Sequence, residues 1–151
     1  MIIERATVSD AEEIISLQRL AYKSEADLYN DYNIPPMTQT VKEVQGEFEH
    51  KIFLKAVVDK KIVGSVRAHR EVDTCHIGRL MVHPENQNRG IGTKLMYEME
   101  NLFESCKRYE LFTGNKSEKN ISLYKNLGYK MFKTEKINDK VSLVYLEKIR
   151  R

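Results

Sequence analysis

The segment from residue 82 to residue 93 constrains the fold more than any other part of the sequence. It reads VHPENQNRGIGT and joins an expected strand to the longest expected helix. A helix start exposes unpaired backbone N–H groups and the positive end of the helix dipole, a combination that binds phosphate. Gly90 and Gly92 leave room for an anion against the backbone, and Arg89 adds a positive charge. The segment is neither a P-loop nor a G-x-G-x-x-G motif, because Leu95 stands at the third glycine position, and an ordinary glycine-containing loop is the alternative.

The periodicity of apolar residues predicts strands and helices along the whole chain. Strands are expected at residues 2–6, 52–58, 61–69, 74–82, 109–113, 129–137 and 141–148, and helices from residue 9, at 40–50, from 91 to about 106, and at 117–127. The order is β-α-α-β-β-β-α-β-α-β-β. Since it mixes antiparallel strands with one β-α-β crossover, the fold class is α+β.

Local signals place several helix ends. Capping boxes at residues 9–12 and 40–43 predict two helix starts. Ser117 is expected to cap the last helix, and Gly128 to end it. Residues 23–38 are predicted to form a loop or a broken helix, and Pro35-Pro36 to end any helix before them.

Composition excludes several classes of protein. The 151 residues carry 25 Lys+Arg and 22 Asp+Glu, and a net charge of +3 is too small to predict a nucleic-acid partner. Such a length fits a single domain over residues 1–151. No apolar run is long enough for a membrane helix, and no secretory signal is visible. Cys75 and Cys106 have no metal or redox spacing, so we expect free thiols, no metal and a cytoplasmic protein.

Two motifs carry a resemblance to a known family. Residues 87–92, QNRGIG, resemble the Q/R-x-x-G-x-G/A motif of the GNAT acetyltransferase superfamily, and residues 80–84 resemble its strand-to-loop entry. Residues 120–129, NISLYKNLGY, are similar to the family's late helix. The resemblance covers nearly the whole chain. It implies a GNAT-type mixed, mostly antiparallel twisted sheet flanked by helices, with acetyl-CoA as the co-substrate between splayed fourth and fifth strands.

The resemblance also implies which residues bind the cofactor. The pantetheine would pair with the strand around Leu80, Met81 and Val82, and the pyrophosphate would lie on the amides that follow. The implied cofactor-binding residues after this strand are Gln87, Asn88, Arg89, Gly90, Ile91, Gly92, Thr93, Asn120 and Tyr124.

Transfer of an acetyl group needs an acid for the leaving thiolate and a route for the amine proton. Tyr124 matches the family tyrosine that lies near the cofactor sulfur; a packed core aromatic is the alternative. His76 is the candidate base, since some members carry a glutamate or histidine at this distance before the motif, and imidazole titrates near neutrality. Gly78 stands where other members carry an acidic residue, so a surface histidine or a water relay stays open.

The acceptor is expected to contact the first helix and the segment after it. Glu25, Tyr29 and Tyr32 fall at i, i+4 and i+7 if that segment is helical, and could hold an amine by charge and aromatic contact. A solvated loop end is the alternative.

The leading interpretation is direct transfer of acetyl from acetyl-CoA to a primary amine of a small molecule. A protein or peptide N-acetyltransferase and a non-catalytic acyl-CoA sensor are the alternatives. Homodimers are frequent in the family, so the resemblance predicts a homodimer.

Overall fold

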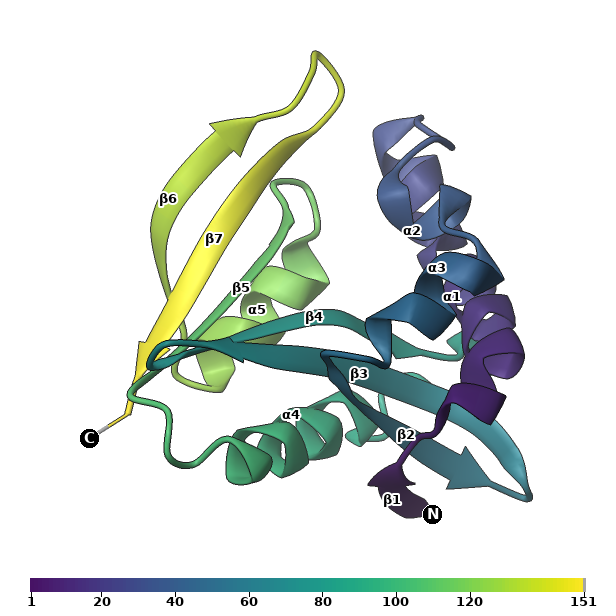
Figure 1. Ribbon diagram of the computed structural model, residues 1–151. Helices are drawn as coiled ribbons and strands as arrows, with labels where there is room; N and C mark the ends of the chain where they lie inside the picture. The colour runs from purple at the N-terminus through teal and green to yellow at the C-terminus, as the bar shows by residue number, and fades with distance from the viewer. Residues whose placement is uncertain (151) are drawn as a thin grey trace.

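The computed structural model describes residues 1–150, which form one seven-stranded sheet with helices on both faces (Figure 1). The strands lie in the order β1-β2-β3-β4-β5-β7-β6, and every neighbouring pair is antiparallel except β4 and β5. Their bounds are β1 Ile2–Arg5, β2 Ile52–Val58, β3 Lys61–Glu71, β4 Thr74–Val82, β5 Arg108–Gly114, β6 Lys130–Lys136 and β7 Ser142–Ile149. The parallel pair is the single crossover predicted from the sequence, so the α+β class is confirmed.

Strands β4 and β5 pair along only part of their length. Their register runs from Thr74 opposite Arg108 to His76 opposite Glu110, and beyond these residues the strands diverge (Figure 1). The far end of β4 therefore keeps one edge that no other strand pairs with.

A β-bulge interrupts β4 where this free edge begins. Gly78 pairs with Arg67 and Met81 pairs with Ser65, so Arg79 and Leu80 together face the single residue between these partners. Arg79 has a φ of 52°, in the left-handed region that non-glycine residues rarely adopt. The extra residue redirects the strand, which is what bulges do next to functional sites.

The helices divide between the two faces of the sheet. Helices α1 (Ala11–Tyr29), α2 (Pro35–Thr38) and α3 (Val41–Glu47) lie on one face, and α4 (Ile91–Leu102) lies on the other (Figure 1). Helix α5 (Glu118–Asn126) follows β5. Two short 3-10 helices, Val8–Asp10 and Pro84–Asn86, precede α1 and α4. Each face has its own apolar core, in which Leu95, Met96 and Met99 of α4 are fully buried and Ile14 and Val44 fill the opposite side.

The element order agrees with the sequence prediction except around residues 23–38. Helix α1 continues to Tyr29 and ends because Asn30 turns left-handed, with a φ of 49°. Pro35 and Pro36 do not end this helix but begin α2, because proline fits the first helical turn, where no N–H partner is needed. The segment is thus a broken helix, and α2 is an element that the predicted order lacks.

Three local predictions were wrong in detail. Ser9 does not cap α1; instead the Asp10 carboxylate accepts the backbone N–H of Thr7 at 2.9 Å, and a 3-10 turn precedes the helix. Cys106 lies beyond the end of α4 rather than on it, although it is buried. Ser117 stands at the N-cap of α5, but its side chain makes no capping bond. The box at Thr40 and Glu43 is confirmed by reciprocal bonds of 2.9 and 3.1 Å.

Candidate active site

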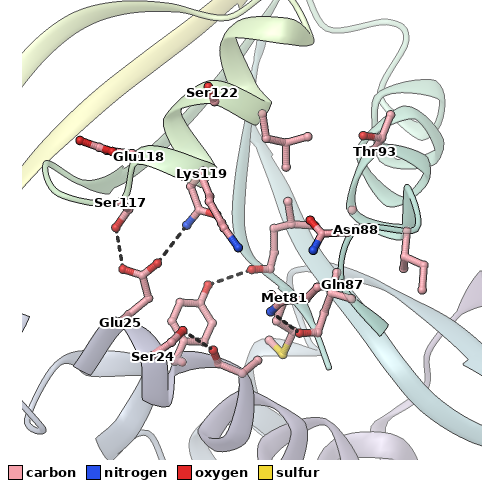
Figure 2. Close-up of a pocket in the computed structure, with 18 of the residues that line it drawn as sticks. Ser24, Glu25, Met81, Gln87, Asn88, Thr93, Ser117, Glu118, Lys119 and Ser122 are labelled. Carbon is pink, nitrogen blue, oxygen red and sulfur yellow. Dashed lines mark hydrogen bonds between the residues drawn. The ribbon is translucent and has the colours of Figure 1, made fainter. Parts of the chain in front are cut away.

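A cleft of about 910 Å³ opens between the end of β4, the start of α4 and the start of α5 (Figure 2). We call it the large cleft. Gln87 and Asn88 lie on one side of it, and Ser117 and Lys119 lie on the other (Figure 2). Its lining includes all the sequence-predicted cofactor residues except Arg89 and Tyr124: Leu80, Met81, Val82, Gln87, Asn88, Gly90, Ile91, Gly92, Thr93 and Asn120. Arg89 is exposed outside the lining.

The loop before α4 presents backbone N–H groups to the large cleft. Asn88 and Gly90 both have positive φ angles, 63° and 78°, and these turn the chain into the helix. The first helical bond runs from the Lys94 N–H to the Gly90 carbonyl at 3.1 Å. The amides of the intervening residues have no helical acceptor, and they lie at the positive end of the helix dipole. This is an anion-binding geometry.

A second cavity of about 510 Å³ adjoins the large cleft, and we call it the small cavity. It lies between the end of α1, the bulge of β4, the end of β5 and the β6–β7 turn. Four residues line both spaces: Tyr22, Glu25, Leu80 and Asn120. The two spaces therefore meet at these residues.

Tyr124 lines the small cavity from α5. Its side chain is 6% exposed, and burial raises the pKa of its hydroxyl above the ordinary value of 10.0. The hydroxyl has no hydrogen-bond partner within residues 1–150, and the ring packs 6.1 Å from that of Tyr129, centroid to centroid. The hydroxyl thus stays protonated at neutral pH and is free to donate.

Glu25 is held in place from the far side of the large cleft. One carboxylate oxygen accepts the Ser117 hydroxyl at 2.6 Å, and the other accepts the Asn120 amide at 3.4 Å (Figure 2). The buried Tyr29 hydroxyl lies 2.8 Å from the Ser117 hydroxyl and accepts the Lys116 N–H at 2.8 Å. Burial raises the pKa of Tyr29. Two of the three predicted acceptor residues, Glu25 and Tyr29, therefore lie together on the small cavity.

A family model described as the acetyltransferase (GNAT) domain matches residues 26–150. The chain belongs to the GNAT family. A curated relative, UPF0157 protein YqkA of Bacillus subtilis (strain 168), is 28% identical over 126 residues, which are 83% of this chain. The chain spans 36% of that relative's length.

Several solved structures share the fold over nearly the whole chain. PaiA N-acetyltransferase from Thermoplasma acidophilum, in complex with coenzyme A, has a TM-score of 0.81 at 19% identity, covering 99% of this chain and 100% of that one. The smu.2055 protein from Streptococcus mutans UA159 has a TM-score of 0.85 at 18% identity, with 99% of both chains covered. The ribosomal-protein-S18-alanine N-acetyltransferase from Escherichia coli has a TM-score of 0.81 at 13% identity, covering 98% and 92%.

Besides Arg89, two residues predicted for the GNAT site lie apart from both spaces. His76 stands where β4 and β5 still pair; its ring lies 3.5 Å from the Glu71 carboxylate and 3.7 Å from the Glu110 carboxylate, and stacks on His69. Tyr32 is exposed after the end of α1 and donates to the Asp27 carboxylate. Their roles as base and acceptor contact stay predictions.

The sequence reasoning missed two residues of this GNAT site. The Tyr22 hydroxyl donates to the Leu80 carbonyl at 3.1 Å and ties α1 to the bulge. Its spacing of three from Glu25 on one helix was a usable signal. Arg79 lines the small cavity, but its position depends on the bulge, which no local pattern indicated.

Within residues 1–150, no group of three metal-ligating side chains is close enough to hold a metal ion. The helices of the same part of the chain are all too short or too polar to cross a membrane.

Proposed function

We propose that the protein transfers the acetyl group of acetyl-CoA to a primary amine of a small molecule. The observation that carries this proposal is that the two spaces adjoin. The large cleft starts at the free amides of α4, follows the unpaired edge of β4, and meets the small cavity at four shared residues.

The residues of the large cleft fit coenzyme A. The free amides at the start of α4 would hold the pyrophosphate. The unpaired edge of β4 at Leu80, Met81 and Val82 would hold the pantetheine through backbone hydrogen bonds, as an added strand does. Asn120 would reach its amides from α5. The T. acidophilum structure of the same fold contains coenzyme A, which supports the assignment.

Acetyl-CoA supplies a thioester, whose C–S bond breaks as the new C–N bond forms. An ammonium acceptor loses two protons in all: one ends on the thiol and one goes to solvent, so the atoms and charges balance. We assign Tyr124 to protonation of the leaving sulfur. The raised pKa of its hydroxyl keeps the proton available at every physiological pH.

The proton of the acceptor amine also needs a route to solvent. His76 is the candidate, through ordered water, because it lies on the same strand as Gly78, a residue of the small-cavity lining. His76→Gln should lower kcat and leave both KM values unchanged. An unchanged kcat would return the deprotonation to solvent.

The small cavity favours a small acceptor over a protein. Its lining includes Ile34, Pro35 and Pro36 from the start of α2, and Ile137, Asn138 and Val141 from the β6–β7 turn. A volume of about 510 Å³ is in the range of small-molecule sites. Glu25 and Tyr29 would hold the ammonium group by charge and aromatic contact.

A thiol-release screen tests the proposed function. Acetyl-CoA and the protein are mixed with amino acids, aliphatic amines, aminoglycosides and short peptides, and free thiol is followed with a chromogenic reagent. Cys75 and Cys106 are buried, and burial raises the pKa of the Cys75 thiol to about 12, so neither should add to the signal. Acceptor-dependent release with small amines is expected. Release with peptide N-termini alone would favour a protein acceptor, and coenzyme binding without any release would favour a sensor.

A further inference from the structure

The small cavity carries one basic side chain that has no acidic partner. Arg79 lines the cavity, and within residues 1–150 no carboxylate lies within 4.0 Å of its nitrogens. Its Nε is buried and has no hydrogen-bond acceptor. A buried donor left unpaired costs about 1–3 kcal/mol, so such a group in a native structure needs an explanation.

Arg67 also has a buried Nε without an acceptor, but the terminal nitrogens of its guanidinium are paired, whereas those of Arg79 have no acidic partner. The guanidinium of the buried Arg67 contacts the Glu47 carboxylate at 2.8 Å and the Gln18 amide oxygen at 2.6 Å. Arg108 is held by Glu110 and Glu147 at 2.7 and 2.6 Å. Arg79 differs because the β4 bulge turns it toward a cavity.

The acidic residues that line the same cavity make their hydrogen bonds with groups other than Arg79. Glu25 is held by Ser117 and Asn120, and it makes no ion pair with Arg79. Asp31 also lines the cavity, but its carboxylate accepts the Asn33 N–H at 2.9 Å in a local turn. The cavity thus presents two carboxylates and one guanidinium, and neither carboxylate forms an ion pair with Arg79.

We infer that the acceptor is a small amine that also carries a carboxylate, with its ammonium group at Glu25 and its carboxylate at Arg79. This inference rests on the proposed function and names its substrate class. A guanidinium presents two parallel N–H donors that match one carboxylate. Arg79 is the single basic residue lining the cavity within residues 1–150, which suits one carboxylate better than a doubly charged phosphate.

Binding to the protein saturated with coenzyme A tests this without turnover. The thiol form of the coenzyme has no acetyl group to transfer, so calorimetry measures acceptor affinity alone. The probes are matched pairs, each an amino acid and the amine that has the same side chain but lacks the carboxylate. The pairs are glycine and methylamine, phenylalanine and phenethylamine, and lysine and cadaverine. Phosphoethanolamine beside ethanolamine gives the phosphate comparison.

In at least one pair, the amino acid should bind at least tenfold more tightly than its amine. Arg79→Gln should abolish that difference, and Arg79→Lys should restore part of it. Arg5→Gln is the matched control, because Arg5 is an exposed residue of β1 far from both spaces in the sheet order.

Three results would overturn the inference: equal affinity within every pair, a preference that survives in a folded Arg79→Gln, or a preference for the phosphate alone. The wild-type pairs decide the matter even if an Arg79 variant does not fold. Equal affinities with coenzyme A bound would leave the proposed function standing, whereas failure to bind coenzyme A would contradict the proposed function itself.

Discussion

The Glu25 carboxylate accepts the Ser117 hydroxyl at 2.6 Å, and this bond joins α1 to the start of α5 across the large cleft. The two residues are 92 positions apart in the sequence. Ser117 is 3% exposed and gives its hydroxyl to this contact instead of to the helix end that it precedes. The bond fixes a carboxylate at the junction of the two spaces, where an incoming amine would meet the thioester.

Glu25→Gln should therefore weaken acceptor binding while leaving coenzyme binding intact. A hydrogen bond to a charged group contributes about 1.5–3 kcal/mol, so the acceptor KM should rise about tenfold or more. Steady-state kinetics, with each substrate varied in turn, measure the acceptor KM and the acetyl-CoA KM separately. Glu12→Gln, at an exposed position in the first turn of the same helix, is the control. An unaltered acceptor KM would remove Glu25 from the acceptor site.

Gly114→Ala should displace Tyr29 and damage the same site. A Cβ at Gly114 would overlap the Tyr29 hydroxyl and ring, so Tyr29 or β5 must move. Overpacking of this kind costs about 1–3 kcal/mol of unfolding free energy. Thermal or urea unfolding measures the loss, and the acceptor KM should rise with it.

The double variant Gly114→Ala/Tyr29→Ala separates overlap from other effects. Once the ring is removed, the Cβ has space, so the double variant should be no less stable than Tyr29→Ala alone. Strict additivity of the two single effects would show that the glycine is required for some other reason.

Tyr124→Phe should lower kcat about a hundredfold, the low end for a positioned acid. A thiol has a pKa near 8.5, so the leaving thiolate is fairly stable unaided, and a phenol with a raised pKa is a weak acid toward it. The ring and its packing are kept, so stability and both KM values should change little. Pre-steady-state rates ensure that the chemical step is measured. A wild-type rate in the Phe variant would assign Tyr124 to packing.

The pH dependence follows from the same hydroxyl. Its pKa is raised above 10.0 in the folded protein, so the acid form persists through pH 10, and kcat should show no fall between pH 8 and 10. The same shift affects the free energy of unfolding. Because the pKa of Tyr124 is higher in the folded than in the unfolded protein, the hydroxyl stabilises the folded state below pH 10, and this stabilisation is lost as the pH rises further. A decline in kcat centred below pH 9, present in the wild type and absent in Tyr124→Phe, would contradict the raised pKa of the Tyr124 hydroxyl.

Local sequence patterns predicted the parts of the site that are themselves local. The loop at residues 87–93 and the helix that carries Tyr124 each depend on a few consecutive residues, and both lie where the sequence indicated. The meander and its turn at Asp59 and Lys60 are likewise short-range. The sequence did not decide between a loop and a broken helix at residues 23–38. The prolines were expected to end any helix there, but α1 ends at the left-handed Asn30.

The remaining parts depend on long-range pairing that a single sequence does not encode locally. The bulge that turns Arg79 exists only because β3 and β4 change register, and the Glu25–Ser117 bond exists only because the fold brings α1 and the start of α5 together at the large cleft. The role of His76 stays a prediction. Its distance before the glycine loop matched the family, but the strand carries it to the paired end of β4, outside both cavity linings.

Calorimetric titration of coenzyme A into Gly90 variants tests most directly that the large cleft is the cofactor site. Gly90→Glu adds a negative side chain where the pyrophosphate would lie, so affinity should fall about a hundredfold or more. Gly90 has a φ of 78°, so Gly90→Asn, which tolerates this conformation, controls for backbone strain and should bind within a few-fold of wild type. Circular dichroism confirms that both variants are folded. Wild-type affinity in a folded Gly90→Glu would contradict the placement of the cofactor and, with it, the proposed function.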